Sequence, residues 1–179
     1  MKKEFFKLSL TLCAITLVAA LLLAAVNFIT AEKIEISQKQ AMEDAMESIL
    51  SEADSFEKVN DAVTKGLKNG GVVGYCVNVA PKGFGGEISM IVGINNDNTV
   101  AGIDILSHSE TAGLGAKADT DDFKSRFKGK NTDINIVKTD SDSDGEVKAI
   151  TGATITSKAI ADGIREARSL VEEIEGGVK

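Results

Sequence analysis

A short run of hydroxyl-bearing and small residues near the C-terminus has the composition of a ligand-holding turn. It reads Thr-Gly-Ala-Thr-Ile-Thr-Ser over residues 151–157. Threonine and serine often cap helix N-termini. Apolar residues follow at three- and four-residue spacing, which predicts an amphipathic helix: Ile160, Ile164, Ala167, Val171 and Ile174. The first turn of a helix has unpaired N–H groups and stabilises an anion by about 0.3–1 kcal/mol, so a phosphate group would suit this turn.

A second segment suited to ligand contact reads Glu-Thr-Ala-Gly-Leu-Gly over residues 110–115. Glycine has no Cβ and lets the backbone approach a ligand closely, while Glu110 and Thr111 offer polar atoms. The preceding His108 is interpreted as a structural or solvent-facing residue. Phe84 lies among glycines and is interpreted as a loop anchor, with contact to a flat ligand as the alternative.

The elements that must position these segments are strands and short helices. Three Val- and Ile-rich stretches, separated by turn residues at 81–86 and 95–98, predict consecutive antiparallel strands: 74–80, 87–94 and 99–107. Asn and Asp tolerate positive φ, which explains the second turn. A short helix is expected over 120–127, and strands over 134–137 and 147–150. The predicted fold class is α+β, with an antiparallel sheet flanked by helices.

The N-terminus has the pattern of a membrane anchor. Lys2, Lys3 and Lys7 precede a stretch, residues 8–31, without any charged residue. Such a helix spans roughly 30 Å or slightly more, enough to cross a bilayer. The lysines predict a cytoplasmic N-terminus. A cleaved signal peptide is the alternative, but its apolar region is usually only about 7–15 residues long.

Three parts of the chain are therefore expected. The cytoplasmic tip and transmembrane helix occupy residues 1–31, a linking amphipathic helix 32–68, and one globular domain 69–179. The linking helix is predicted from a capping box at Ser37 and Gln40 and from apolar residues at helical spacing between 42 and 53.

Composition narrows the function. The net charge of −7 argues against a nucleic-acid partner. With one His, one Tyr and no Trp, the chain favours a borrowed cofactor over a residue-based catalytic site. Cys13 and Cys76 lie in different environments and predict neither a disulfide nor a metal site. The Asp-rich run 140–145 lacks the Glu that ends an EF-hand loop and is interpreted as a solvated turn.

These motifs together resemble a known family. The Thr-Gly-Ala-Thr unit, followed by Ile-Thr-Ser, and the run 83–115 are similar to the FMN-binding domain of the G subunit of the Rnf complex. The same domain occurs in the C subunit of the sodium-pumping NADH:quinone oxidoreductase. In this family a flavin transferase esterifies the last threonine of the unit to the FMN phosphate, and Thr154 is the matching residue. Ala112 replaces the family's usual proline, and Lys148 its common aspartate.

The resemblance implies roles for individual residues. Those expected to shape the phosphate turn are Gly152, Ala153, Thr156 and Ser157. Those expected to contact the flavin are Glu110, Thr111, Gly113 and Leu114. No residue set predicts hydride transfer to NAD, and no catalytic residue or metal ligand is expected on this chain.

The implied function is that of an electron-transfer subunit with covalent FMN in an ion-pumping ferredoxin:NAD oxidoreductase. The implied partners are the membrane and iron-sulfur subunits of that complex, and the flavin transferase during maturation. The chain would be a single-pass protein of the cell (inner) membrane with an extracytoplasmic C-terminal domain. The alternatives are the C subunit of the quinone reductase, a self-standing extracytoplasmic flavin reductase, and a non-redox membrane-tethered binding module.

Overall fold

The computed structural model describes residues 2–139, 141 and 143–176. The chain divides into two compact units, residues 1–40 and 41–179. The first consists of the N-terminal part of helix α1, which spans Lys2–Ile49. Asp140 and Asp142 of the predicted acidic turn lie outside the described residues.

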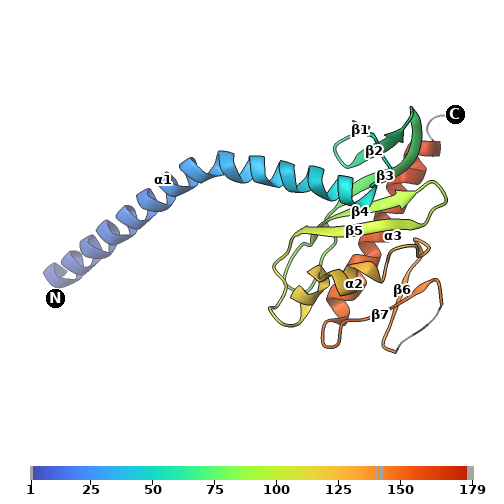
Figure 1. Ribbon diagram of the computed structural model, residues 1–179. Coiled ribbons are helices and arrows are strands. Elements are labelled where there is room, and N and C mark those ends of the chain that lie inside the picture. The colour runs from blue at the N-terminus through green and yellow to red at the C-terminus, as the bar shows by residue number, and fades with distance from the viewer. Residues whose placement is uncertain (1, 140, 142, 177–179) are drawn as a thin grey trace. The chain divides into compact units, whose positions relative to one another are not determined.

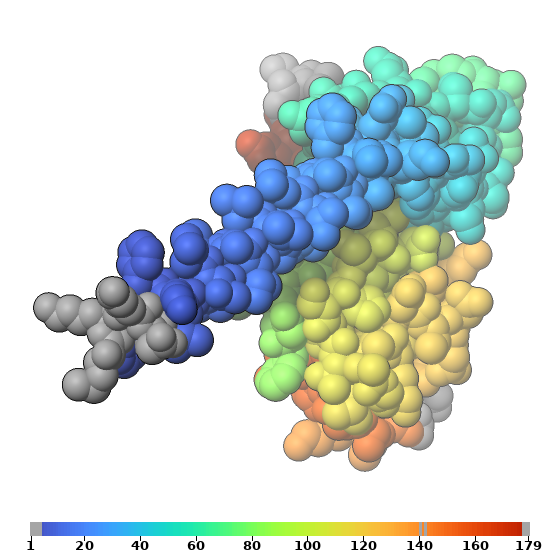
Figure 2. All heavy atoms as spheres, turned by 90° about the vertical axis from the view of Figure 1, so that its left-hand side faces the viewer, coloured from blue at the N-terminus to red at the C-terminus, as the bar shows by residue number. Residues whose placement is uncertain are grey.

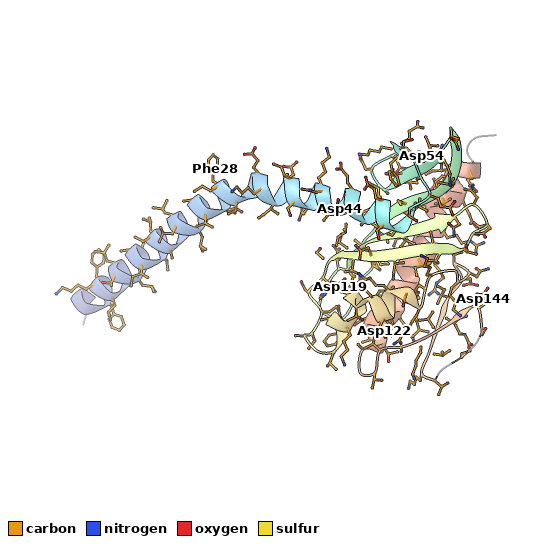
Figure 3. The ribbon with its side chains drawn as sticks, in the orientation of Figure 1. Phe28, Asp44, Asp54, Asp119, Asp122 and Asp144 are labelled. Atoms are coloured by element: carbon orange, nitrogen blue, oxygen red, sulfur yellow. The ribbon has the colours of Figure 1, made fainter. Side chains whose placement is uncertain are left out.

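The surface of the first unit is apolar. Its large hydrophobic side chains are exposed from Phe5 onward, and Phe28, with 86% of its surface exposed, points away from the helix axis (Figure 3). Figure 2 shows this part of α1 as a rod of side chains. The hydroxyls of Thr11 and Thr30 donate to the carbonyls four residues earlier, each over 2.9 Å. A helix with apolar side chains outside and its hydroxyls bonded to its own backbone suits lipid, and it is long and apolar enough to cross a membrane.

The second unit is built on an antiparallel sheet of five strands in sequential order (Figure 1). The strands are β1 (Ser55–Lys58), β2 (Val63–Lys68), β3 (Gly71–Val79), β4 (Ser89–Asn95) and β5 (Val100–Ser107). The three strands that the sequence predicted are confirmed as β3, β4 and β5. The turn between β4 and β5 contains Asn98 at φ 62°, as the turn chemistry predicted.

The predicted linking helix over 32–68 is wrong in extent. Helix α1 ends at Ile49, and the residues after it form β1 and β2. Asn69 and Gly70, with φ of 51° and 80°, make the tight turn from β2 into β3. Val63 of β2 is fully buried opposite Val77 of β3. This burial draws the segment into the sheet and outweighs its weak helical pattern.

Both faces of the sheet are covered. Alternate residues of β3 and β4, among them Val77 and Val92, enter a core shared with the C-terminal helix α3 (Thr154–Gly176). The intervening residues, Cys76 and Ile91, pack with Ala45 in the last turns of α1. The period-two alternation of strand side chains produces these two layers. The predicted α+β fold is therefore confirmed.

The remaining elements connect β5 to α3. They are the 3₁₀ helix η1 (Gly115–Asp119), helix α2 (Asp121–Ser125), and the parallel strands β6 (Asn135–Val137) and β7 (Glu146–Lys148). The Thr120 side chain caps α2 by accepting a hydrogen bond from the Phe123 N–H. Phe123 and Phe127 pack edge to face, with ring centroids 5.2 Å apart. Residues 149–153 connect β7 to α3, and residues 154–157 form the first turn of α3, so the hydroxyl-rich run joins a strand to the C-terminal helix, as predicted.

Candidate functional site

A cavity of about 370 Å³ lies at the N-terminal end of α3. We call it the α3 cavity. Its walls come from three segments that are far apart in the sequence: the glycine loop before β4, the 110–115 segment after β5, and the first turn of α3. The lining residues are Phe84, Glu110, Thr111, Leu114, Gly115, Gly152, Ala153, Thr154, Ile155 and Thr156. The two segments that the sequence singled out thus share one cavity.

The hydroxyls of the 151–157 turn differ in their environments. Thr156 is 1% exposed and donates a hydrogen bond to Glu110 Oε2 over 2.5 Å. Ser157 is fully buried, and its Oγ accepts from the Ile150 N–H and donates to the Ala153 carbonyl, each at 3.0 Å. Thr154, the half-buried first residue of α3, lines the α3 cavity. Its Oγ1 makes no hydrogen bond within the described part of the chain.

Gly152 gives the turn its shape. Its φ of +82° lies in the left-handed region that side-chain-bearing residues rarely adopt. A Cβ at this position would also lie 3.1 Å from Leu114 Cδ2, on the opposite segment. Glycine therefore lets the chain reverse direction after Thr151 and keeps the two walls of the cavity close together.

Glu110 is the buried charged residue of the site, with 8% of its surface exposed. Its Oε1 accepts a hydrogen bond from the Gly85 N–H over 2.9 Å, and its Oε2 accepts the one from Thr156. Burial by itself raises the pKa of this carboxyl. The donors at Thr156, Gly85 and Phe84, together with His108, outweigh burial and place the pKa below its ordinary value. Glu110 is therefore ionised at neutral pH.

Apolar side chains form the rim of the cavity. Phe84, Leu114 and Ile155 have 69%, 44% and 55% of their surfaces exposed. Within described residues 41–176, Val59 is the one other exposed large hydrophobic residue. The interpretation of Phe84 as a loop anchor is wrong, because its ring lies at the surface of the cavity. Exposed apolar side chains gathered around a cavity are typical of a ligand-binding site.

The structure also separates the predicted residues. Gly113 and Ser157 do not line the α3 cavity: Gly113 makes a turn beside it with φ +78°, and Ser157 braces the turn from behind. Gly115, a glycine expected to allow close approach of a ligand, lines the cavity, and so does Ile155, which was not predicted. Gly115 belongs to the glycine segment already singled out. Ile155 was part of the hydroxyl-rich turn, but nothing in the sequence indicated that its side chain is exposed.

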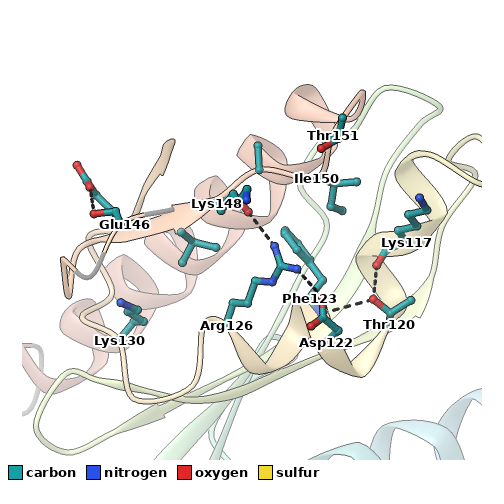
Figure 4. A pocket seen from close by; sticks show the side chains of 13 residues that line it. Lys117, Thr120, Asp122, Phe123, Arg126, Lys130, Glu146, Lys148, Ile150 and Thr151 are labelled. Carbon is teal, nitrogen blue, oxygen red and sulfur yellow. Dashed lines mark hydrogen bonds and ion pairs between the residues drawn. The ribbon is translucent and has the colours of Figure 1, made fainter. Parts of the chain in front are cut away.

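A larger groove of about 860 Å³ lies between α2 and β7. Figure 4 shows Arg126 reaching across it, where its guanidinium pairs with Asp122 over 2.5 Å and donates to the Lys148 carbonyl over 3.4 Å. Lys130 donates to the Ser143 carbonyl over 2.8 Å. These contacts hold α2 against the strand that leads into the hydroxyl-rich turn. The groove therefore supports the site's framework, and none of the predicted site residues lines it.

Comparison with known proteins bears on both units. Residues 83–169 match the family model of the FMN-binding domain, and residues 1–49 match that of the RnfG N-terminal region. The G subunit of the proton-translocating ferredoxin:NAD(+) oxidoreductase complex of Clostridium ljungdahlii is 36% identical, over 98% of this chain and 96% of the relative. The Na(+)-translocating counterpart of Acetobacterium woodii is 38% identical, over 90% of this chain and 89% of the relative.

Solved structures agree on the fold. The C subunit of the Na(+)-translocating NADH-quinone reductase from Parabacteroides distasonis matches with a TM-score of 0.51 and 27% identity. The match covers 59% of this chain and 57% of that one. The NqrC protein of Shewanella oneidensis matches with a TM-score of 0.52 and 21% identity, over 64% of this chain and 65% of that one. These chains share the fold over part of their length, whereas the two ferredoxin:NAD(+) oxidoreductase relatives match almost throughout.

The cavity at the start of α3 thus belongs to an FMN-binding domain, and α1 lies within the residues that match the RnfG N-terminal region. The chain is a member of the RnfG family, the G subunits of ion-translocating ferredoxin:NAD(+) oxidoreductase (Rnf) complexes.

Proposed function

We propose that this protein is the membrane-anchored electron carrier of an ion-translocating ferredoxin:NAD oxidoreductase, and that it holds FMN covalently through Thr154. The observation that carries the proposal is that one cavity has both an apolar rim and a hydroxyl that makes no hydrogen bond to the described residues. Thr154 and Thr156 of the first turn of α3 both line the cavity, but only Thr156 uses its hydroxyl in a hydrogen bond between described residues, and Phe84, Leu114 and Ile155 surround the same cavity. A flat aromatic ring system bearing a phosphate fits both features.

The first turn of α3 suits a phosphoester. Its residues 154–157 include no acidic side chain, and the helix N-terminus has unpaired N–H groups and a partial positive charge. When the ester forms, the Thr154 hydroxyl loses its proton and a new O–P bond replaces the bond to the leaving group of a phosphoanhydride-activated FMN donor. The diester keeps one negative charge beside the helix. A flavin transferase would be the partner that performs this maturation step.

The bound flavin would supply the redox chemistry, accepting and releasing electrons. The residues of this chain would bind and orient it: the α3 turn by its phosphate, and the apolar rim by its rings. Covalent attachment matters outside the cytoplasm, because non-covalent binding depends on a free ligand concentration near the dissociation constant. An ester at Thr154 removes this dependence.

Membership of the RnfG family supports an assembly with other subunits. Its relatives are subunits of Rnf complexes, so the partners would be membrane and iron-sulfur subunits. In this arrangement the chain carries electrons, and other subunits react with ferredoxin and NAD and move the ion. The N-terminus would lie in the cytoplasm, with α1 crossing the membrane once and the FMN-binding domain on the extracytoplasmic side.

The test is flavin fluorescence of the full-length protein on a denaturing gel after expression in a host that matures it. We expect a fluorescent band that is abolished by Thr154→Ala and retained by Thr154→Ser, which keeps the hydroxyl. The Ala variant should fold normally, because the Thr154 hydroxyl makes no hydrogen bond to the residues that the structure describes, and alanine favours helices.

Thr151→Ala is the matched control, because Thr151 belongs to the same turn but lines the other groove. It should keep its fluorescence. A folded Thr154→Ala protein that still carries covalent flavin would rule out the proposed attachment site. A native protein without flavin would instead favour the non-redox binding module.

A further inference from the structure

The walls of the α3 cavity are joined by one carboxylate. Glu110 contacts the glycine loop through Gly85, 25 residues earlier, and α3 through Thr156, 46 residues later. The three segments share no regular strand pairing with one another. The two hydrogen bonds to this single side chain therefore link all three walls of the cavity.

Glycines enclose the carboxylate closely. A Cβ at Gly83 would lie 2.3 Å from Glu110 Oε1, and a Cβ at Gly115 would lie 2.5 Å from Oε2. Both distances are well inside van der Waals contact, so the Glu110 carboxylate packs directly against the backbone of these two glycines. The carboxylate thus has a fixed position, and a different side chain at either glycine would displace it.

Hydrogen-bond donors stabilise the negative charge of the Glu110 carboxylate. Thr156 and the amides of Gly85 and Phe84 favour its ionised form, and His108 is the titratable group that acts on it. The amide of Glu110 itself donates to His108 Nδ1 over 3.2 Å. Hydrogen-bond donors keep a carboxylate ionised without removing its field, and that field is screened little where water is excluded.

We propose that Glu110 is a positioning residue that sets the geometry of the flavin cavity and, by its fixed negative charge, lowers the reduction potential of the flavin. This proposal rests on the proposed function. A negative charge beside the cavity opposes the arrival of an electron there, so the flavin becomes a stronger reductant. This effect does not require direct contact between Glu110 and the flavin, because the electric field of the carboxylate extends into the cavity that Glu110 lines.

The decisive variant is Glu110→Gln in the full-length, flavin-loaded protein. Glutamine is nearly isosteric and keeps a carbonyl oxygen for the Gly85 N–H, but it has no charge. The measurement is a potentiometric titration followed by flavin absorbance. We expect a higher midpoint potential, with about a tenfold rise in the ratio of reduced to oxidised flavin at the native midpoint, or about 59 mV for one electron. An unchanged potential would overturn the proposal.

Glu87→Gln is the matched control, because Glu87 is an exposed acid near the same loop and solvent screens its charge. Its potential should equal the native value. If the Gln variant does not accumulate, Glu110→Asp decides the matter: it keeps the charge, so its potential should stay close to the native value, and a rise of the size expected for charge loss would contradict the proposal. Native protein that carries no flavin would refute the proposed function instead.

Discussion

At the scale of single residues, the site separates structural hydroxyls from a chemically available one. Thr156 and Ser157 are buried and hydrogen-bonded, whereas Thr154 is half-buried, lines the cavity and makes no side-chain hydrogen bond to the described residues. The three residues have similar side chains, and their roles follow from burial and from the α3 backbone. Modifying a hydroxyl that is hydrogen-bonded to a buried group leaves that group without its hydrogen-bond partner, which is destabilising. The proposed attachment at Thr154 is therefore the one that leaves the buried hydrogen bonds of Thr156 and Ser157 intact.

Cys76 provides a test of burial at the same scale. Burial raises the pKa of its thiol from an ordinary 9.0 to about 12. Below pH 9 both the folded and the unfolded chain keep this proton. Between 9 and 12 the unfolded chain loses it first, so this thiol's contribution to the free energy of unfolding is lost as pH rises through that window.

We expect native protein to lose stability relative to Cys76→Ala above pH 9, by up to about 1.4 kcal/mol per pH unit. Urea unfolding of both proteins across this range isolates the effect, since every other group is common to the pair. Parallel stability curves would mean that the thiol is accessible to water.

At the scale of elements, the last turn of α1 is seated on a pair of glycines. Gly93 of β4 and Gly102 of β5 are directly opposite each other in the sheet, and Ile49 lies over both. A Cβ at Gly93 would lie 2.1 Å from Ile49 Cγ2, whereas a Cβ at Gly102 would lie 3.6 Å from Ile49 Cγ1. The helix thus approaches one strand more closely than its neighbour.

Gly93→Ala should therefore destabilise residues 41–176 by about 1–3 kcal/mol through overpacking. Gly102→Ala is the matched control and should change stability by less than about 1 kcal/mol. Thermal unfolding of the two variants measures the difference. Adding Ile49→Ala to Gly93→Ala should relieve the clash, so a double variant whose losses simply add would show that Ile49 is not the obstacle.

At the scale of the whole molecule, the surface of the apolar helix suits lipid, whereas the surface of the acidic globular unit suits water. The first unit exposes apolar side chains along α1, and the second buries its apolar residues on both faces of its sheet. Lys2, Lys3 and Lys7 precede the apolar stretch, and positive charge is retained on the cytoplasmic side of membranes. The FMN-binding domain should therefore lie on the other side.

Protease protection tests this orientation. Protease added outside cells with a permeabilised outer envelope should digest residues 41–179, while the same protease added to inverted membrane vesicles should leave them intact. A cytoplasmic marker protein controls for cell integrity. The reverse pattern of protection would place the domain in the cytoplasm and would remove the reason given for covalent attachment.

The sequence by itself determined the elements whose signals are local. The uncharged N-terminal stretch, the turn residues at 95–98 and the apolar spacing of residues 160–174 each predicted a helix or turn that the structure contains, because propensity and periodicity act over a few residues. Asn69–Gly70 is a typical hairpin dipeptide, but no hairpin was predicted there, because residues 55–68 were included in the linking helix predicted over 32–68. The burial of these residues against β3 is not visible in the local sequence.

Only the tertiary structure decided which residues share the cavity. Glu110 and Thr156 are 46 positions apart, and no pattern in the sequence shows that one side chain holds both segments. The sequence also left the exposure of Phe84 undecided, because an aromatic residue flanked by glycines can either be buried as a loop anchor or be exposed at the rim of a cavity. Long-range packing sets burial, and burial here separates the residues that support the site from those that face its ligand.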